Sequence, residues 1–334
     1  MIAMTGPTVL TILLNFRTPD LTLRSAEAAL AAMEHVAGEI VIVDNDSGDG
    51  SFETIRAAAE ARGWLGSGRL RVIASDHNGG FGAGMNVGMA AGLASGAAPD
   101  FYYLLNSDAF PEAGTIAALR DFLIAHPKAG FAGSFVYGED GLPHQTAFRF
   151  PSAAGEFETA ARTGIFSRLL KNAIVALPVP AETTQIDWTA GASLMLRAGM
   201  IHQIGGFDET FFLYYEETEL CHRAARAGWQ CWFVPKSRIM HLGSVSTGMK
   251  RWSRTPGYWF DSRRYYFTKT HGPAYALAAT LARVAGQTIW GLRRLLQGKP
   301  QADPDHFLRD LVAHSFGPGL KPRKTASPLT ATPR

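Results

Sequence analysis

Apolar runs and helix-forming segments alternate over the first 135 residues of the chain. Four short, continuous apolar runs have the pattern of strands that are buried on both faces of a parallel sheet. These runs cover residues 9–14, 39–43, 70–74 and 101–105. Helix-forming segments follow the first three runs, over residues 21–33, 52–62 and 82–93. The alternation predicts βαβ units with right-handed crossovers, and therefore an α/β fold with a mostly parallel sheet flanked by helices.

The pattern is less regular in the second half of the chain. Residues 151–185 indicate a helix and a mobile loop, and residues 188–197 again have the character of a strand. A helix over residues 217–227 is expected to end at Gly228. The next strand is expected over residues 230–234 and to end at Pro235, because proline cannot donate a hydrogen bond within a sheet.

A long helix is predicted over residues 274–296, with an apolar stripe along one side. The stripe consists of Leu277, Leu281, Val284, Thr288, Leu292 and Leu295. Three arginines, Arg283, Arg293 and Arg294, interrupt the segment, so it does not have the pattern of a bilayer-spanning helix. We expect residues 251–316 to form a helical, basic C-terminal region and the Pro-, Lys- and Thr-rich residues 317–334 to be disordered.

The composition is typical of a folded α/β protein with many loops. Apolar residues make up 46% of the 334 residues, which is enough for the core of one large domain or two smaller ones. Charged residues make up 18%, and there are 35 glycines. These values exclude a disordered or fibrous chain. The formal net charge of +3 is too small for bulk electrostatic attraction to nucleic acid.

The cysteines and the N-terminus predict a cytoplasmic protein. Cys221 and Cys231 are the only cysteines, and no Cys/His spacing resembles a zinc site, so we expect two core thiols in a reducing compartment. Residues 1–10 lack the basic and apolar regions of a signal peptide. No apolar stretch in the sequence is long enough to predict a transmembrane helix.

Positive charge is concentrated in residues 236–300, which contain twelve Lys or Arg residues and Asp261 as their one acidic residue. Aromatic and basic residues are interleaved over residues 251–269, a mixture that suits a membrane interface. The same mixture also fits a solvated face, or stacking on single-stranded nucleic acid, which no other feature of the sequence favours. Our hypothesis is that this region and the long helix hold the protein against anionic lipid on the inner face of the plasma membrane.

Polar residues follow each predicted strand of the first half, at the edge where parallel sheets bind ligands. They are Asn15-Phe16, Asp44-Asn45, the segment 76–79, and Asn106-Ser107-Asp108. A carboxylate such as Asp44 can accept the imide N–H of a pyrimidine base, or it can cap the turn that follows its strand. Asp108 can present a ligand-binding carboxylate, or it can cap the helix expected near Glu112.

A glycine-rich loop, HNGGFGAG over residues 77–84, lies between the third strand and the next helix. Its backbone N–H groups can approach a diphosphate at the N-terminus of that helix. The loop does not follow the first strand and does not match the GxGxxG pattern, so a fold that binds nicotinamide dinucleotides fits poorly.

Acidic residues are concentrated in the segment IGGFDETFFLYYEETEL, residues 204–220. Glu216, Glu217 and Glu219 lie at the expected start of a helix, where the helix dipole stabilises acids, so a purely structural role is one interpretation. His241 follows the strand after this helix and, taken alone, fits a structural histidine. Together with Asp108, it forms a His and carboxylate pair that suits Mn²⁺ or a similar metal ion.

Seven motifs occur in an order that resembles a known family. They are VLTILLNF, IVIVDNDSGDGS, NGGFGAGMNVG, YYLLNSDAFP, WTAGASLMLR, GGFDETFFLYYEETELCHRAARAG and HLGS. The chain resembles the inverting family 2 glycosyltransferases of the GT-A fold, especially their bacterial rhamnosyltransferase-like branch, from about Thr8 to Ser246. The resemblance implies a GT-A catalytic domain over residues 1–250, with a nucleotide-binding half over about 1–135 and an acceptor half over about 136–250.

The resemblance assigns roles to individual residues of the nucleotide side. Asp44 would contact the nucleobase, with Asn15 and Phe16 lining the same pocket, and Asn78 and Gly79 would lie beside the nucleotide. The metal-binding motif maps onto Asn106, Ser107 and Asp108. Asn106 replaces the first acidic residue of the common two-Asp form, so metal binding would depend mainly on Asp108 and His241.

Roles on the acceptor side follow in the same way. The family's catalytic base maps onto Glu217, with Glu216 directly before it; aspartate is the commoner residue at this position, so the segment is better determined than the choice between the two. Trp188 and Gly191 match the acceptor-side motif, and Asp208 is expected to brace its loop.

The implied reaction is a metal-assisted single displacement with inversion, in which Mn²⁺ or Mg²⁺ neutralises the leaving diphosphate and a Glu accepts the acceptor's proton. The resemblance favours L-rhamnose from a dTDP- or UDP-linked donor and a glycan or lipid-linked acceptor in cell-surface polysaccharide synthesis. The alternative from another class is a non-catalytic nucleotide-sugar or glycan-binding protein, which the replacement at Asn106 keeps open. A nucleotidyltransferase would need a glycine-rich, basic signature near the first strand, and residues 15–20 lack one.

Overall fold

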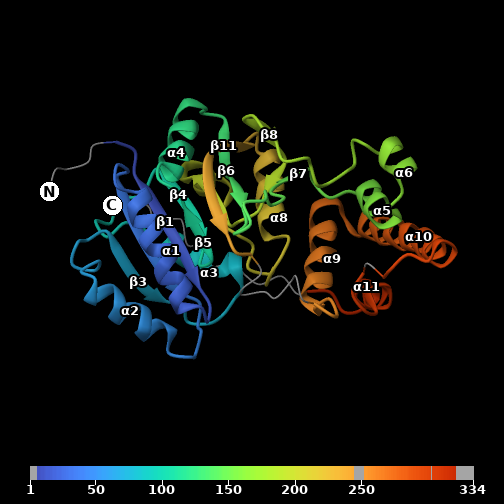
Figure 1. Cartoon of the computed structure of the whole chain (residues 1–334), viewed down its shortest axis with the longest axis horizontal. Helices are drawn as coiled ribbons and strands as arrows, with labels where there is room; N and C mark the ends of the chain where they lie inside the picture. The colour runs from blue at the N-terminus through green and yellow to red at the C-terminus, as the bar shows by residue number, and fades with distance from the viewer. Residues whose placement is uncertain (1–5, 244–251, 302, 321–334) are drawn as a thin grey trace.

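A computed structural model of the chain describes residues 6–243, 252–301 and 303–320 (Figure 1). Its centre is a nine-stranded sheet in these residues, in the order β3-β2-β1-β4-β10-β6-β11-β5, with β8 paired to β11. The first four strands, which are all parallel to one another, are β1 (Val9–Asn15), β2 (Gly38–Asp44), β3 (Leu70–Ala74) and β4 (Phe101–Asn106). The α/β fold with a mostly parallel sheet is therefore confirmed, and each predicted strand of the first half is present.

Helices cover both faces of the sheet, as the sequence predicts. One face carries α1 (Pro19–Ala32), α2 (Ser51–Ala61) and α4 (Thr115–Ala125), and the other carries α3 (Phe81–Ala90), α7 (Ala198–Ile204) and α8 (Glu216–Arg226). Cys221 and Cys231 are buried in the core of the second face, in agreement with their expected role. Gly84 and Gly88 let α3 lie close to β1, because a Cβ atom at either position would overlap Leu14 or Ile12.

The strands of the second half are rearranged relative to the sequence prediction. The remaining strands are β5 (Ala109–Pro111), β6 (Ala129–Tyr137), β7 (Ala147–Phe148), β8 (Thr184–Ile186), β9 (Trp188–Thr189), β10 (Ser193–Arg197) and β11 (Gln230–His241). The expected strand over 188–197 is two strands, because β9 pairs with β7 in a separate small sheet while β10 lies antiparallel between β4 and β6. The expectation that Pro235 ends its strand is wrong. The pairing of β11 with β6 shifts register between Val234 and Arg238, and an irregularity of this kind accommodates a residue that lacks an N–H.

A group of helices forms a second layer at one end of the molecule (Figure 1). They are α5 (Ala153–Ala161), α6 (Gly164–Leu169), α9 (Gly257–His271), α10 (Pro273–Gln297) and α11 (Phe307–Phe316). α5 packs against α10, and Gly286 permits the close approach because a Cβ atom there would lie 2.6 Å from the carbonyl oxygen of Phe157. The segment 153–169, which we placed in the acceptor half, thus lies with the C-terminal helices.

A buried ion pair joins these helices. The Arg263 guanidinium on α9 is 1% exposed and donates to the Glu156 carboxylate on α5 at 3.0 and 3.2 Å. Arg283 on α10 lies 3.7 Å from the same carboxylate. A buried charge is costly without a partner, so this cluster fixes how α5, α9 and α10 are turned toward one another.

Some expectations fall outside the described residues. They concern Ser244 of the HLGS motif, the domain boundary at 250/251 and residues 321–334 of the expected disordered tail. The division into domains stays a prediction. Among the helices that the structure describes, none combines the length and the apolar character needed to cross a membrane.

Candidate active site

A cavity of about 210 Å³ lies at the carboxyl ends of β1, β2 and β4. Its lining comes from strand exits of the first half and from later segments of the chain: Leu14, Phe16, Asn45, Asn78, Gly80, Phe81, Asn106, Ser107, Asp108, Phe212, Leu213 and Tyr258. Five of the predicted nucleotide-side residues, Phe16, Asn78, Asn106, Ser107 and Asp108, are among them. Sequence reasoning missed Tyr258, which α9 brings to the wall, although the aromatic and basic segment that contains it was a signal.

Asn15 and Asp44 lie behind the cavity wall, where they form a buried hydrogen-bonded cluster. They are 0% and 3% exposed, respectively. The Asn15 side-chain amide donates to Asp44 Oδ1 at 2.6 Å. The Ser47 hydroxyl donates to the same oxygen at 2.6 Å, and the Ser47 backbone N–H donates to Asp44 Oδ2 at 3.1 Å. The turn-capping interpretation of Asp44 is therefore confirmed, and its contact with a nucleobase stays a prediction.

The glycine-rich loop is tied to the segment before α8. Gly80 has φ of 92°, and a Cβ atom there would overlap the Phe212 carbonyl. The Phe81 backbone N–H donates to the same carbonyl oxygen at 3.2 Å. On the loop side, the Asn78 side-chain oxygen accepts from Gly80 N–H at 3.0 Å and from Asn45 Nδ2 at 3.0 Å. The loop thus presents its backbone to the cavity in one fixed conformation.

Asp108 and His241 are 133 residues apart in sequence and lie side by side in the fold. Antiparallel pairing of β11 with β5 places His241 opposite Ala109. His241 Nε2 lies 3.0 Å from Asp108 Oδ1 and 3.4 Å from Asn106 Nδ2. The second carboxylate oxygen of Asp108 accepts the Gly243 N–H at 3.1 Å. The structure therefore brings together the two residues that the sequence predicts as metal ligands.

Asp108 and His241 fit a divalent cation to which a bound substrate would also contribute ligands. Asp108 lines the cavity and offers an oxygen, and His241 beside it offers a nitrogen. Mn²⁺ accepts both of these ligand types. In the described ranges no group of three or more His, Cys, Asp or Glu side chains is placed to hold a metal ion. The two side chains alone are too few for a closed protein site, so a cation held here would need further oxygen ligands from a bound substrate or from water.

The two glutamates at the start of α8 have different surroundings. Tyr214 and Tyr215 adopt left-handed conformations with φ of 68° and 69° directly before the helix. Glu216 is 2% exposed, and its Oε2 atom has no hydrogen-bond partner in the described part of the chain. Glu217 is half-buried, and its Oε1 atom accepts the Gly191 N–H at 3.0 Å.

Glu217 is also the glutamate that lies near the cavity. A Cβ atom at Gly191 would lie 2.7 Å from Glu217 Oε1 and 2.8 Å from the ring of Phe81, which lines the cavity wall. Burial raises the pKa of Glu217, and burial together with the charge of Glu217 raises the pKa of Glu216 further. Geometry therefore favours Glu217 over Glu216 for contact with a substrate.

The remaining predicted residues support the site from outside the cavity. Asp208 accepts hydrogen bonds from the Thr210 N–H, the Tyr265 hydroxyl and the Lys269 ammonium, at 2.9, 2.9 and 2.6 Å, so it braces its loop against α9. Burial alone would raise the pKa of Asp208, but the Lys269 and Thr210 hydrogen bonds lower it overall. Trp188 stacks on Phe148 at 4.2 Å within the small sheet.

Comparisons with known proteins agree with this arrangement. Residues 7–263 match the model of a family described as glycosyltransferase like family 2. An N-acetylglucosaminyl-diphospho-decaprenol L-rhamnosyltransferase of Mycobacterium tuberculosis is 27% identical over 237 residues, which cover 69% of this chain and 74% of the relative. A low-salt glycan biosynthesis hexosyltransferase of Haloferax volcanii is 26% identical over 56% of this chain and 53% of its own length.

Among solved structures, the chain resembles the mannosyltransferase PcManGT from Pyrobaculum calidifontis in complex with GDP-Man and Mn²⁺. The TM-score is 0.56 at 15% sequence identity, over 89% of this chain and 77% of that one. This likeness confirms the GT-A type of fold.

We expect Gly80→Ala to destabilise the protein more than a substitution at another glycine of positive φ. A side chain at the positive φ and extended ψ of Gly80 costs about 1–3 kcal/mol, and an overlap in a packed region costs about 1–3 kcal/mol, so unfolding in urea should show a loss of about 3 kcal/mol or more. The control is Gly96→Ala, because Gly96 has φ of 80° but open space around it. Only backbone strain should lower the stability of that variant. Equal losses in the free energy of unfolding of the two variants would show that the contact with Phe212 does not contribute to stability.

Proposed function

We propose a reaction for this chain, which belongs to glycosyltransferase like family 2 and is a hexosyltransferase of the GT-A fold. It transfers L-rhamnose from a dTDP- or UDP-linked donor to a glycan or lipid-linked glycan acceptor, with inversion at the transferred carbon. The observation that carries the proposal is that Asp108 and Phe81 line one cavity. Asp108 pairs with His241, and the Glu217 carboxylate lies beside the Phe81 ring at Gly191. A proton acceptor and a site for a diphosphate are the two groups that such a displacement needs.

The proposed roles on the donor side follow the cavity lining. Phe16 and Asn78 line the part of the cavity at the strand exits, where we place the nucleotide, with Gly79 in the adjoining backbone. Asn15 and Asp44 support this part from behind through their buried hydrogen bonds. We assign Asp108 and His241 to a divalent cation, which when bound would supply Lewis-acid stabilisation to the leaving diphosphate.

The proposed base acts on the acceptor. Glu217 accepts the proton of the attacking hydroxyl through a carboxylate that the Gly191 N–H holds in place. Burial raises the pKa of this carboxylate, which makes it a stronger base once it is ionised. Gly191 leaves room for the carboxylate and the Phe81 ring, because any Cβ atom there would overlap both. We place the acceptor on the side of the cavity where Gly191 lies. Trp188 comes shortly before Gly191 in the sequence.

The choice of substrates is supported by the relatives. One relative is named an L-rhamnosyltransferase that acts on a diphospho-decaprenol-linked N-acetylglucosamine, so we infer a rhamnosyl donor and a lipid-diphosphate-linked acceptor for this chain. Such a reaction fits the synthesis of cell-surface polysaccharide on the cytoplasmic face of a membrane.

A second candidate function rests on Asn106. An amide at this position of the metal motif supplies no negative charge, which favours a protein that binds nucleotide sugars without turning them over. Hydrolysis or transfer of a donor on addition of metal ion would exclude this candidate.

We expect a thermal-shift panel of nucleotide sugars with Mn²⁺ to single out the rhamnosyl donor. A ligand that binds only the folded chain stabilises it by mass action, by about 2.7 kcal/mol at a concentration 100 times its Kd. dTDP-rhamnose should raise the Tm most, and dTDP alone should raise it less. A larger shift with a galactose or glucose donor would contradict the choice of sugar while leaving the glycosyltransferase assignment intact.

We expect Glu217→Gln to lower kcat for transfer by about 10²–10⁴-fold while nucleotide binding is retained, because general-base catalysis typically contributes that much. In the unmodified chain kcat should rise with pH through a pKa above the ordinary value of 4.5, because burial favours the protonated form and only the ionised form accepts a proton. Glu216→Gln is the matched control and should keep turnover. If Glu216→Gln is the inactive variant, the base is misassigned.

We expect chelation by EDTA to abolish transfer and Mn²⁺ or Mg²⁺ to restore it. Asp108→Asn should lower transfer at saturating metal by about 10²-fold or more, since it removes a charged group that stabilises the leaving diphosphate. His241→Asn should raise the metal concentration needed for half-maximal activity. The control is Asp140→Asn on the exposed loop before Pro143. Activity that is insensitive to EDTA would remove the metal-binding roles of both residues.

A further inference from the structure

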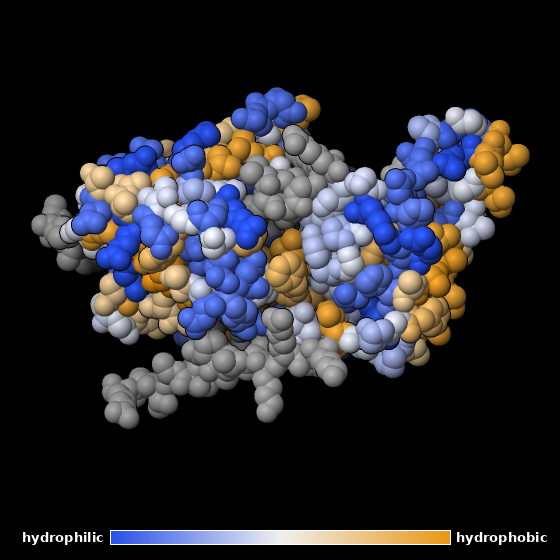
Figure 2. Space-filling model, turned by 90° about the horizontal axis from the view of Figure 1, so that it is seen from below, coloured by the Kyte–Doolittle hydropathy of each residue, from blue (hydrophilic) through white to orange (hydrophobic). Residues whose placement is uncertain are grey.

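The leucines of the apolar stripe of α10 are exposed, whereas Val284 in its middle packs against Phe260, Phe307 and Leu311. Leu277, Leu281, Leu292 and Leu295 are 44%, 57%, 58% and 75% exposed, and Leu296 beside them is 86% exposed. The residues of α10 that are buried are smaller or polar: Ala276, Ala279, Thr280, Gly286 and Gln287. Figure 2 shows hydrophobic residues gathered at the end of the molecule where the C-terminal helices lie. A soluble protein rarely leaves an apolar stripe of this length uncovered, so the face is a candidate for contact with a partner or a membrane.

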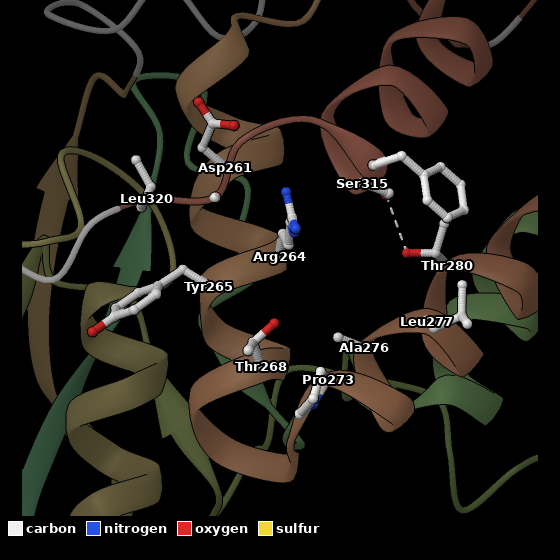
Figure 3. A pocket seen from close by; sticks show the side chains of 12 residues that line it. Asp261, Arg264, Tyr265, Thr268, Pro273, Ala276, Leu277, Thr280, Ser315 and Leu320 are labelled. Carbon is white, nitrogen blue, oxygen red and sulfur yellow. Dashed lines mark hydrogen bonds between the residues drawn. The ribbon is translucent and has the colours of Figure 1, made fainter.

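Other exposed apolar side chains lie in the same group of helices. Leu277 lines a cavity of about 250 Å³ between α9, α10 and the end of α11, shown in Figure 3. Phe316, which also lines this cavity, is 68% exposed. On α6, which follows the α5 helix packed on α10, Ile165 and Leu169 are 68% and 73% exposed.

Several of the basic side chains that the sequence places in this region pair with acidic side chains. Glu156 pairs with Arg263 and Arg283, and Lys269 pairs with Asp208. Arg254 pairs with Asp310. These pairs neutralise basic side chains that would otherwise form an electrostatic surface for anionic lipid. Part of the positive charge concentrated in this segment of the sequence is therefore used in packing the helices together.

The basic residues that border the apolar face lack acidic neighbours on the same helices. Neither α6 nor α10 contains Asp or Glu. Arg293 donates to the Arg162 carbonyl oxygen, and Arg294 donates to the Gln301 side chain, so the hydrogen bonds of both go to neutral groups. Lys299 follows α10, and Arg168 lies on α6. Asp303 lies in the same cavity as Arg294 and pairs with Arg162, so basic residues outnumber acidic ones here without excluding them. An apolar face with this excess of positive charge nearby complements the acyl region and the phosphate groups of a lipid surface.

We propose that the outward face of α10, defined by Leu277, Leu281, Leu292, Leu295 and Leu296, lies in the interface of a lipid membrane and is the main attachment of this chain to it. Burial of these leucines drives the attachment. The positive charges of Arg168, Arg293, Arg294 and Lys299 add a smaller preference for anionic lipid. The exposed α6 side chains Ile165 and Leu169 extend the contact. This inference places the enzyme where a lipid-linked acceptor lies, but it does not depend on the proposed sugar or base.

The test is flotation of the full chain with phosphatidylcholine vesicles and with vesicles that also contain phosphatidylglycerol. Leu281→Gln with Leu295→Gln should weaken partitioning into both by about tenfold or more, because two exposed leucines lose their burial and glutamine keeps the helix. The matched control is Ile124→Gln with Leu142→Gln, which are 46% and 63% exposed elsewhere on the molecule and should change nothing. Arg294→Gln with Lys299→Gln should reduce only the preference for phosphatidylglycerol.

Salt separates the two driving forces. In about 1 M NaCl, where the Debye length is about 3 Å, binding to phosphatidylcholine should persist. Absence of binding to either vesicle, or unchanged binding of the leucine variant, would overturn the proposal. A dimer of the unmodified chain that the leucine variant dissociates, measured by light scattering, would also overturn it by showing that a second copy covers the face. Stabilisation by dTDP is measured in every variant, so a failure here is distinguishable from a failure of the donor site.

Discussion

The close contact between Gly80 and the Phe212 carbonyl is the constraint on which the site depends. It joins the loop after β3, which belongs to the parallel half of the sheet, to the segment that leads into α8. Phe81 then lies between the cavity and Gly191, and Glu217 lies against Gly191. The residues that we propose for the donor and for the acceptor are more than one hundred positions apart in sequence, and they are held in one place because the backbones touch where no side chain fits.

The sheet topology supplies the other half of the site. Parallel strands direct their exits to one edge, which gathers Phe16, Asn106 and Asp108 around the cavity. The short strand β5 then turns back to pair with β11, and this pairing carries His241 to within 3.0 Å of Asp108. The parallel strands alone would present only the nucleotide side. The antiparallel additions bring in the residue that completes the proposed metal-binding pair.

Packing of the C-terminal helices determines which surface they expose. Arg263 and Glu156 are both buried, and separating them would leave an uncompensated charge in the interior. Their pairing fixes the charged side of α9 toward α5, while Gly286 lets α10 approach α5 closely. The leucines of α10 are left on the outside as a consequence. Tyr258, on α9 as well, lines the cavity, so this one helix connects the candidate active site with the layer that carries the proposed membrane face.

The sequence by itself determined the βαβ half of the fold, because strands buried on both faces are continuous apolar runs, and it located the segments around Asp108, Glu217 and His241. The tertiary structure decided the rest. It placed Asp44 behind the cavity rather than on its wall, distinguished Glu217 from Glu216, carried β11 through Pro235 and turned the leucines of α10 outward. Local sequence patterns indicate which residues prefer burial or a given backbone conformation. The outcomes above depend instead on contacts between segments that are distant in sequence, and the periodicity of one segment carries no information about such contacts.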